Sequence, residues 1–114
     1  MGDERASMLQ GTLELLILKI VSHEAMHGWG ITQRIELVSQ RVLFVNQGSL
    51  YPALERLTRR GWLRSEWRTT ESNRRARYYE ITASGRRRLA VEEEGWVRVS
   101  GAVNAVLAWN GALP

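Results

Sequence analysis

Residues 45–61 read VNQGSLYPALERLTRRG, a sequence in which three leucines recur at spacings of four and three. This spacing predicts a helix over residues 47–60 that buries one apolar stripe. Asn46 is the candidate N-cap, because its side chain can accept a hydrogen bond from the first turn. Gly61 is a natural C-terminal stop for the same helix.

Pro52 leaves two starting points open for this helix. If the helix begins at Gln47, Pro52 lies beyond the first turn and removes one backbone hydrogen bond. If Ser49 is the cap instead, Pro52 lies in the first turn, where its missing N–H is tolerated.

The polar side of this helix has the composition of a surface that reads DNA. At about 100° per residue the leucines and Ala53 share one side. The other side carries Gly48, Ser49, Pro52, Glu55, Arg56 and Arg59, with Gln47 and Tyr51 at the boundary. A helix-turn-helix protein reads base edges with this N-terminal end, and Gln pairs well with adenine. The alternative is an ordinary amphipathic surface helix.

Two helices are expected upstream of this segment. Apolar residues recur at spacings of three and four from Leu9 to Glu24, and again from Gly28 or Gly30 to Ser39. The intervening residues 23–28 read as a connection.

A hairpin and a long helix are expected downstream. Residues 62–68 and 77–82 have strand-like patterns, and the polar, basic residues 69–76 form the tip. Thr82 can cap a last helix over residues 83–108. The order predicts an α+β, mainly helical fold: a winged helix-turn-helix domain over residues 9–82, with a C-terminal dimerisation helix over residues 83–109.

Positive charge is concentrated in one part of the chain. The formal net charge is +4, but residues 56–88 hold eleven Arg against three Glu. A basic block on an otherwise acidic chain favours a polyanionic partner. Four residues would project from the hairpin toward phosphates or an A·T-rich minor groove, namely Asn73, Arg74, Arg75 and Arg77. The alternatives are a solvated, salt-bridged surface and a charged hairpin that prevents edge-to-edge pairing.

Several classes of protein are disfavoured. The chain has no cysteine, and its apolar run Leu13–Val21 is too short to span a membrane, so we expect a cytoplasmic protein with no membrane partner. His23 and His27 lie in the expected connection, so we expect no metal site and no cofactor. No nucleophile with a base and no carboxylate pair is evident, so we expect no enzyme.

These motifs resemble those of the PadR family of bacterial transcription regulators. The stretch VNQGSLYPAL at residues 45–54 is similar to the family signature, and MHGWGI at 26–31 is similar to its second-helix motif, in which Tyr is more usual than Trp29. NRRARYYEIT at 73–82, with Gly85 beyond it, resembles the family's wing. The resemblance covers about residues 9–107.

The resemblance implies a DNA-binding repressor that binds a palindromic or near-palindromic operator in double-stranded DNA. In many members a small molecule weakens this binding, and the chain resembles the compact subfamily with a single C-terminal helix. Carried over to this sequence, the DNA contacts would be Gln47, Ser49, Tyr51, Pro52, Asn73, Arg74, Arg75 and Arg77. Arg56 is added from its place on the helical wheel. Tyr51 is either a phosphate ligand through its hydroxyl or a packing residue.

The last helix is expected to form a homodimer. Heptad a and d positions carry Leu89, Trp96, Val99, Val103 and Val106, while Glu92 interrupts the series. Trp96 would either stack a small aromatic effector or fill the dimer core. The competing function is a winged-helix module that binds protein or RNA and responds to no ligand.

Overall fold

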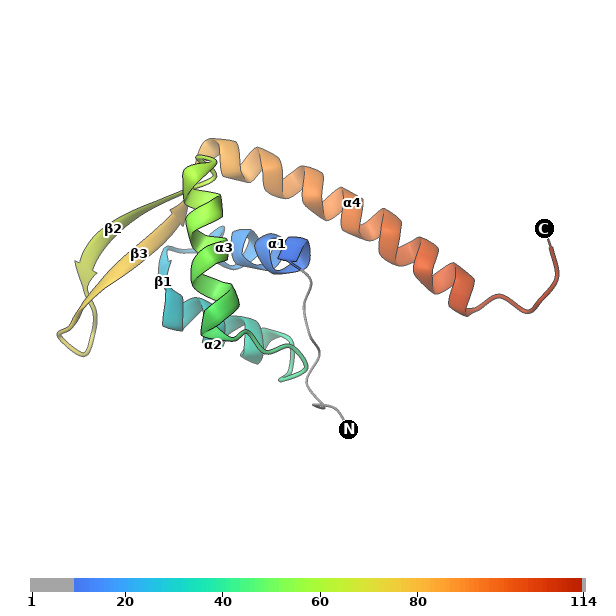
Figure 1. Ribbon diagram of the computed structural model, residues 1–114, viewed down its shortest axis with the longest axis horizontal. Coiled ribbons are helices and arrows are strands. Elements are labelled where there is room, and N and C mark those ends of the chain that lie inside the picture. Colours follow the sequence, from blue (N-terminus) through green and yellow to red (C-terminus); the bar gives the residue numbers. More distant parts are fainter. Residues whose placement is uncertain (1–9, 114) are drawn as a thin grey trace.

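The computed structural model describes residues 10–113 and confirms the predicted winged-helix, mainly helical α+β fold (Figure 1). Leu9, the first apolar residue of the predicted first helix, lies outside the described residues. The elements in chain order are α1 (Gln10–Val21), β1 (Met26–His27), α2 (Gly28–Val38), α3 (Gln47–Arg59), β2 (Leu63–Thr69), β3 (Arg75–Ile81) and α4 (Ala83–Leu107).

The core lies where the first three helices meet the inner end of the sheet. Each helix supplies its apolar stripe, and Leu63, Tyr79 and Ile81 close the core from the strands. The fully buried side chains of α3 are Leu50, Ala53, Leu54 and Leu57, which is the stripe that the leucine spacing predicted.

Both ends of α3 are set by local side-chain and backbone geometry. The Asn46 side chain accepts a hydrogen bond from the Ser49 N–H at 2.8 Å, so the helix begins at Gln47 and the alternative cap at Ser49 is wrong. Pro52 therefore lies inside the helix. At the other end Gly61 has a φ of +79°, and the Trp62 N–H donates to the Leu57 carbonyl at 3.0 Å. This left-handed turn sends the chain back into β2.

A short strand, β1, occupies part of the segment that the sequence predicted as a plain connection. Met26 pairs with Tyr79 and His27 with Tyr78, which makes a three-stranded antiparallel sheet in the order β1-β3-β2. His27 also caps α2, because its Nδ1 accepts from the Gly30 N–H at 3.0 Å. A two-residue strand has no periodicity of its own, so the sequence alone did not reveal it.

The wing is the antiparallel ribbon of β2 and β3, which pair from Leu63↔Ile81 outward to Thr69↔Arg75. Its tip is shorter than the predicted residues 69–76, because the Thr70 N–H donates to the Arg74 carbonyl at 2.6 Å. Arg75 consequently lies in β3 and not in the tip.

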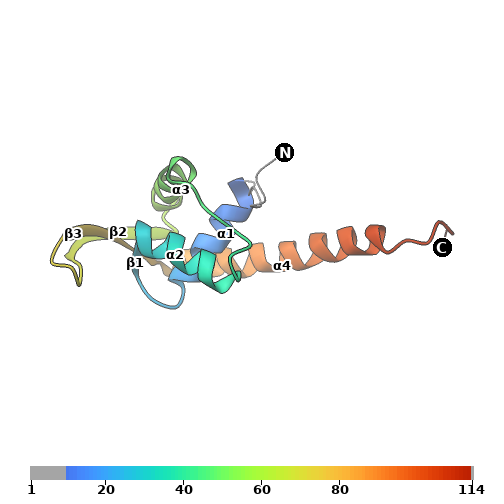
Figure 2. The same ribbon diagram turned by 90° about the horizontal axis from the view of Figure 1, so that it is seen from below.

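Helix α4 begins on the winged domain and then extends away from it (Figures 1 and 2). Thr82 caps it as predicted, with its hydroxyl accepting from the Gly85 N–H at 2.9 Å. Only Gly85 and Leu89 are buried among its residues, and the molecule is 60 Å long as a result. Within the described residues no helix combines the length and apolar character needed to cross a bilayer.

Leu89 corrects one of the predicted dimer contacts. Its side chain is only 7% exposed and belongs to the core of its own chain. It is therefore not available to a partner. The other predicted dimer contacts, Trp96, Val99, Val103 and Val106, are all exposed.

Candidate nucleic-acid interface

The exposed side of α3 carries the residues that the sequence assigned to base reading. Gln47, Ser49, Tyr51 and Pro52 are all exposed, and they occupy the first two turns of the helix. The backbone that carries them is held in place, because the opposite side of α3 is buried in the core. The helix thus presents its N-terminal end on a rigid support.

Tyr51 combines packing with exposure. Its ring lies against the start of α2, so closely that a methyl group added to Gly28 would come within 2.9 Å of the Tyr51 hydroxyl oxygen. The same side chain is half-exposed. The hydroxyl is therefore held in place by α2 and can still reach a ligand, so the two roles left open for Tyr51 do not exclude each other.

The wing has two faces that differ in how their arginines are used. Side chains alternate along a strand, so Trp67, Arg75, Arg77 and Tyr79 share one face. Among residues 10–113 neither Arg75 nor Arg77 forms a salt bridge with a carboxylate. The positive charge on this face is free to act on a ligand.

On the opposite face the arginines are paired within the chain. Arg64 donates from Nε to Glu80 at 2.6 Å, and Arg68 donates from Nε to Glu66 at 2.7 Å. The hydrogen bond and the charge of Arg64 lower the pKa of Glu80 below its ordinary value. This face carries balanced charge, whereas the face toward α3 does not.

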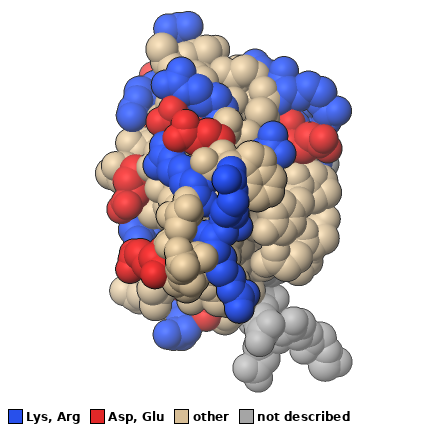
Figure 3. Space-filling view, turned by 90° about the vertical axis from the view of Figure 1, so that its left-hand side faces the viewer, with Lys and Arg blue, Asp and Glu red and all other residues tan. Residues whose placement is uncertain are grey.

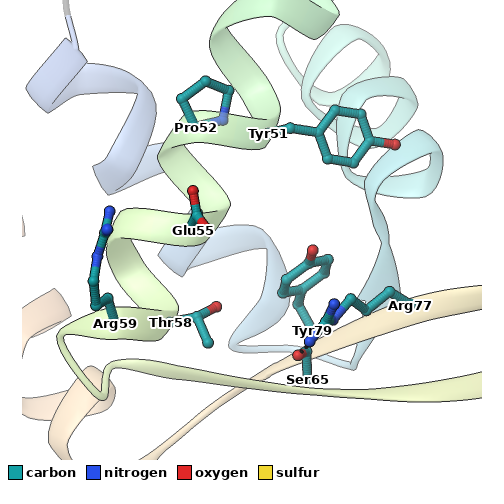
Figure 4. Close-up of a pocket in the computed structure, with 8 residues that line it drawn as sticks. All are labelled: Tyr51, Pro52, Glu55, Thr58, Arg59, Ser65, Arg77 and Tyr79. Atoms are coloured by element: carbon teal, nitrogen blue, oxygen red, sulfur yellow. Dashed lines mark hydrogen bonds between the residues drawn. The ribbon is translucent and has the colours of Figure 1, made fainter.

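A groove of about 580 Å³ lies between α3 and the unpaired face of the wing. Figure 4 shows the Tyr79 hydroxyl pointing from the wing toward α3, with Tyr51 and Pro52 on the other side of the groove. The residues that line it are Tyr51, Pro52, Glu55, Thr58, Arg59, Ser65, Arg77 and Tyr79. Three of the predicted DNA contacts, from two separate elements, therefore meet in one concave surface.

Two wing side chains give this groove hydrogen-bond donors. Arg77 donates from Nε to the Ser65 hydroxyl at 2.9 Å, which fixes the guanidinium over the sheet. Burial raises the pKa of Tyr79, opposed by the nearby charge of Arg77. Tyr79 thus stays protonated in neutral and mildly basic solution and can donate to a phosphate oxygen.

Arg56 is the predicted site residue that the structure corrects. The helical wheel placed it on the outer side of α3, but its side chain turns toward α1. Its Nε donates to Glu14 at 2.7 Å, and Arg60 donates to the other oxygen of the same carboxylate at 3.0 Å. Glu14 is only 13% exposed, so this ion pair holds Arg56 against the protein.

Asn73 and Arg74 lie beyond the groove, at the exposed tip of the wing. Asn73 has a left-handed φ of 64°, which Asn tolerates better than most residues, so the turn itself accounts for its presence. Gln47 and Ser49 lie at the other limit of the surface, at the start of α3. Neither pair lines the groove.

Ser65 and Tyr79 line the groove, and Trp67 shares their face of the wing, but the sequence did not single out these three residues. Their strands were identified, but the face on which each side chain lies depends on the strand register. Figure 3 shows the consequence from the wing end, where basic side chains run down the middle of the face and acidic ones lie mostly beside them.

A second concave region flanks Trp96, between α1 and α4. On one side it is lined by Leu15, Leu16, Leu43 and Val97, with Lys19 and Glu93 at its edge, and encloses about 410 Å³. On the other side Trp96 lines a more open hollow together with Thr12 and Val99. Within residues 10–113, no three His, Asp or Glu side chains gather as a metal site.

Comparisons with known proteins match both the sequence and the fold. The model of the transcriptional regulator PadR-like family matches residues 17–91. A PadR-like transcriptional regulator from Bacillus cereus is 30% identical, with a TM-score of 0.77, over 92% of this chain and 100% of its own.

Two other solved structures agree. A protein from Streptococcus mutans UA159 is 26% identical, with a TM-score of 0.81, over 96% of this chain and 98% of its own. A PadR family transcriptional regulator from Eggerthella lenta is 29% identical, with a TM-score of 0.73, over 89% of this chain and 86% of its own.

Proposed function

The chain belongs to the PadR-like family of transcriptional regulators, and from this DNA-binding, regulatory role we propose that it is a repressor that binds a near-palindromic operator as a homodimer. The N-terminal end of α3 would read bases in the major groove, and the wing would bind the adjacent backbone and minor groove. The proposed base contacts are Gln47 and Ser49, with Tyr51 and Pro52 beside them. The proposed wing contacts are Asn73, Arg74, Arg75 and Arg77.

One observation carries this proposal: Arg77, an arginine of the wing without a carboxylate partner among the described residues, lines the same groove as the exposed side of α3. Arg77 and Tyr51 line it from opposite sides, and Tyr79 adds a hydroxyl donor. A phosphate backbone that enters this groove meets a guanidinium and two phenol groups without breaking an ion pair. The carboxylate of Glu55 in the same groove disfavours a phosphate at that point and suits the amino group of a cytosine.

Binding to duplex DNA is tested with two matched double variants of the wing. Arg75→Ala/Arg77→Ala removes two arginines from the face toward α3, and Arg64→Ala/Arg68→Ala removes two from the opposite face. Both change the net charge equally. We expect the first double variant to lose most of its affinity in a fluorescence anisotropy titration and the second to lose little.

Salt dependence gives an independent readout of the same experiment. Each lost phosphate contact should reduce the slope of log affinity against log salt concentration by about 0.9. For the Arg75→Ala/Arg77→Ala variant, the slope of log affinity against log salt concentration should therefore be smaller in magnitude by about 1.8. Equal losses for both double variants would show that net charge and not the wing face determines binding. Tighter binding to duplex RNA than to DNA would contradict the proposal.

The proposed dimer rests on the exposed apolar side of α4. Trp96, Val99, Val103 and Val106 recur at heptad spacing and are half-exposed or more in a single chain. A second copy that packs along this side would bury them and would fix two reading helices at a set distance. The operator should then contain two half-sites about 34–36 Å apart, one helical turn of DNA. An inverted repeat upstream of the gene for this chain is the first sequence to test.

The proposed effector is a flat aromatic molecule that binds beside Trp96. The cavity there is lined mainly by apolar side chains, and the two charged residues that line it, Lys19 and Glu93, neutralise each other in an ion pair at 3.2 Å. A planar dye that fluoresces in apolar surroundings should bind the wild-type protein and release the operator. Trp96→Ala should abolish dye binding and the release of the operator by the dye, compared at a protein concentration at which sedimentation shows that the variant is still a dimer. Release of the operator by the dye from the Trp96→Ala protein would contradict this site.

A further inference from the structure

An indole lies on the wing face that the proposed function assigns to DNA. Trp67 is 55% exposed and stands directly opposite Arg77 in the strand register. The guanidinium carbons of Arg75 and Arg77 lie 6.0 Å and 5.8 Å from its ring centroid. The three side chains form one cluster of an indole and two cations, which is called the wing cluster below.

Packing within the chain does not account for Trp67. The buried part of this wing face consists of Leu63, Tyr79 and Ile81, at the inner end of the ribbon. Trp67 lies outward of these residues, where two strands alone make up the wing. Only the two arginines lie against its ring, and more than half of the residue stays exposed. A large apolar side chain left in water is unfavourable, so a partner that covers it would gain free energy from its burial.

The register places the wing cluster beside the groove between α3 and the wing. Ser65, Arg77 and Tyr79 point into that groove (Figure 4), and Trp67 follows Ser65 by two residues on the same strand face. Two residues along a strand advance by about 6.6 Å. Trp67 therefore continues the groove outward, away from α3 and toward the wing tip.

We infer that Trp67 is a DNA contact, and that its indole packs against the deoxyribose walls of the minor groove next to the major groove that receives α3. This inference rests on the proposed function. Sugars present C–H groups along the walls of the minor groove, and a flat ring enters a groove about 6 Å wide by its edge. Arg75 and Arg77, next to the ring on the neighbouring strand, neutralise the phosphates that border the groove.

The chemistry of this contact differs from that of its neighbours. An arginine that binds phosphate releases a condensed counterion, so its contribution depends on salt. An indole that covers sugar C–H groups releases water and no counterion, so its contribution to the affinity does not depend on the salt concentration. It also carries little sequence information, because sugars are the same at every base pair.

The first test compares the salt dependence of single variants on one operator duplex. Trp67→Ala should weaken binding about tenfold at every salt concentration, with an unchanged salt slope. Arg75→Ala should weaken binding and reduce the slope by about 0.9. Trp67→Phe keeps a flat apolar ring and should recover much of the affinity. Trp109→Ala is the matched control, because Trp109 is 56% exposed but lies beyond the end of α4.

The second test observes the sugars and the ring directly. Hydroxyl radicals cleave DNA by attack on deoxyribose hydrogens in the minor groove. The wild-type protein should protect the sugars of a short minor-groove segment beside each half-site from cleavage. The Trp67→Ala variant should fail to protect this segment and should protect the rest of the operator as the wild type does. Labelling with 5-fluorotryptophan gives each indole its own fluorine resonance, and the resonance that is missing from the Trp67→Phe variant belongs to Trp67. In the wild-type protein this resonance should shift when DNA binds. This measurement does not depend on whether the alanine variant folds.

The outcomes separate this inference from the proposed function. If the wild-type protein binds no duplex, the proposed function and this contact fail together. If the wild-type protein binds with a steep salt slope while Trp67→Ala retains full affinity and footprint, only the contact is overturned. A Trp67→Ala variant that loses salt slope as Arg75→Ala does would also overturn it, because Trp67 would then act only by positioning the arginines.

Discussion

Glu14 shows how a single carboxylate changes the role of an arginine on the reading helix. Arg56 has the sequence position of a DNA contact, yet it and Arg60 both donate to Glu14, which is largely buried on α1. The two ion pairs tie α3 to α1, and neither arginine lines the groove. The long side chain of Arg56 can turn in either direction, and the acceptor that decides the direction lies 42 residues away in sequence.

Glu14→Gln should destabilise the fold. The amide keeps the shape of the carboxylate but leaves two guanidinium groups without their charged acceptor, at a cost of about 1–3 kcal/mol. Urea denaturation at fixed protein concentration measures the change. Glu93→Gln is the control. Both side chains of the Lys19–Glu93 ion pair are about half-exposed, so its loss should lower the free energy of unfolding by less than about 1 kcal/mol. Equal shifts for the two variants would contradict the buried role of Glu14.

Gln47→Ala and Arg74→Ala should differ in the kind of loss that they cause. Gln47 lies at the exposed start of α3, so its loss should reduce the preference for operator over random duplex by about 1–3 kcal/mol. Arg74 lies at the wing tip, and its loss should weaken binding to both duplexes alike. Competition titrations with the two duplexes measure the ratio, and a ratio changed equally by both variants would contradict the division.

At the scale of elements, helix α3 and the wing are each well defined by sequence, but their relation is not. The leucine spacing, the Asn46 cap and the Gly61 stop gave α3 to within one residue at its end. The two long strands were identified with errors of one or two residues. Their mutual register placed Trp67, Arg77 and Tyr79 on the face toward α3, and β1 joined the sheet from a segment with no pattern of its own.

Asn46→Ala should weaken α3 at the end that is proposed to read bases. The variant removes the acceptor of the Ser49 N–H, at a cost of about 1 kcal/mol, or about 4 °C in Tm. Asn46→Ser keeps an acceptor at the same place and should stay close to wild type. Thermal unfolding followed by circular dichroism compares them. An alanine variant as stable as the serine variant would argue against the cap.

At the scale of the whole molecule, half of the chain's last helix has no partner within its own chain. Helix α4 spans 25 residues, about 37 Å, and its buried residues end at Leu89. The remaining apolar side chains face outward, and Trp96 stands beside the cavity at α1. In the proposed dimer, the same helix would link the spacing of the reading helices to the occupancy of that cavity.

Val99→Glu should give a monomer. A carboxylate at this heptad position would have to be buried without a partner in the proposed dimer, which is strongly unfavourable. Sedimentation equilibrium at micromolar concentration measures the mass, and binding to a single half-site should survive while binding to the full operator weakens. Asn104→Glu adds the same charge at an exposed position outside the a and d series and should stay dimeric. A dimer that persists in the Val99→Glu variant would refute the proposed interface.

Sequence by itself determined the order of the long elements, the buried stripe of α3, its C-terminal stop and the family. These features depend on residues a few positions apart, so their pattern is visible along the chain. Only the tertiary structure decided that Arg56 forms an ion pair with Glu14 and that Leu89 belongs to the chain's own core. It also decided that Tyr51, Arg77 and Tyr79 line one groove. Each of these depends on a contact between elements far apart in sequence. The packing angle of the helices and the strand register set such contacts, and neither leaves a local pattern.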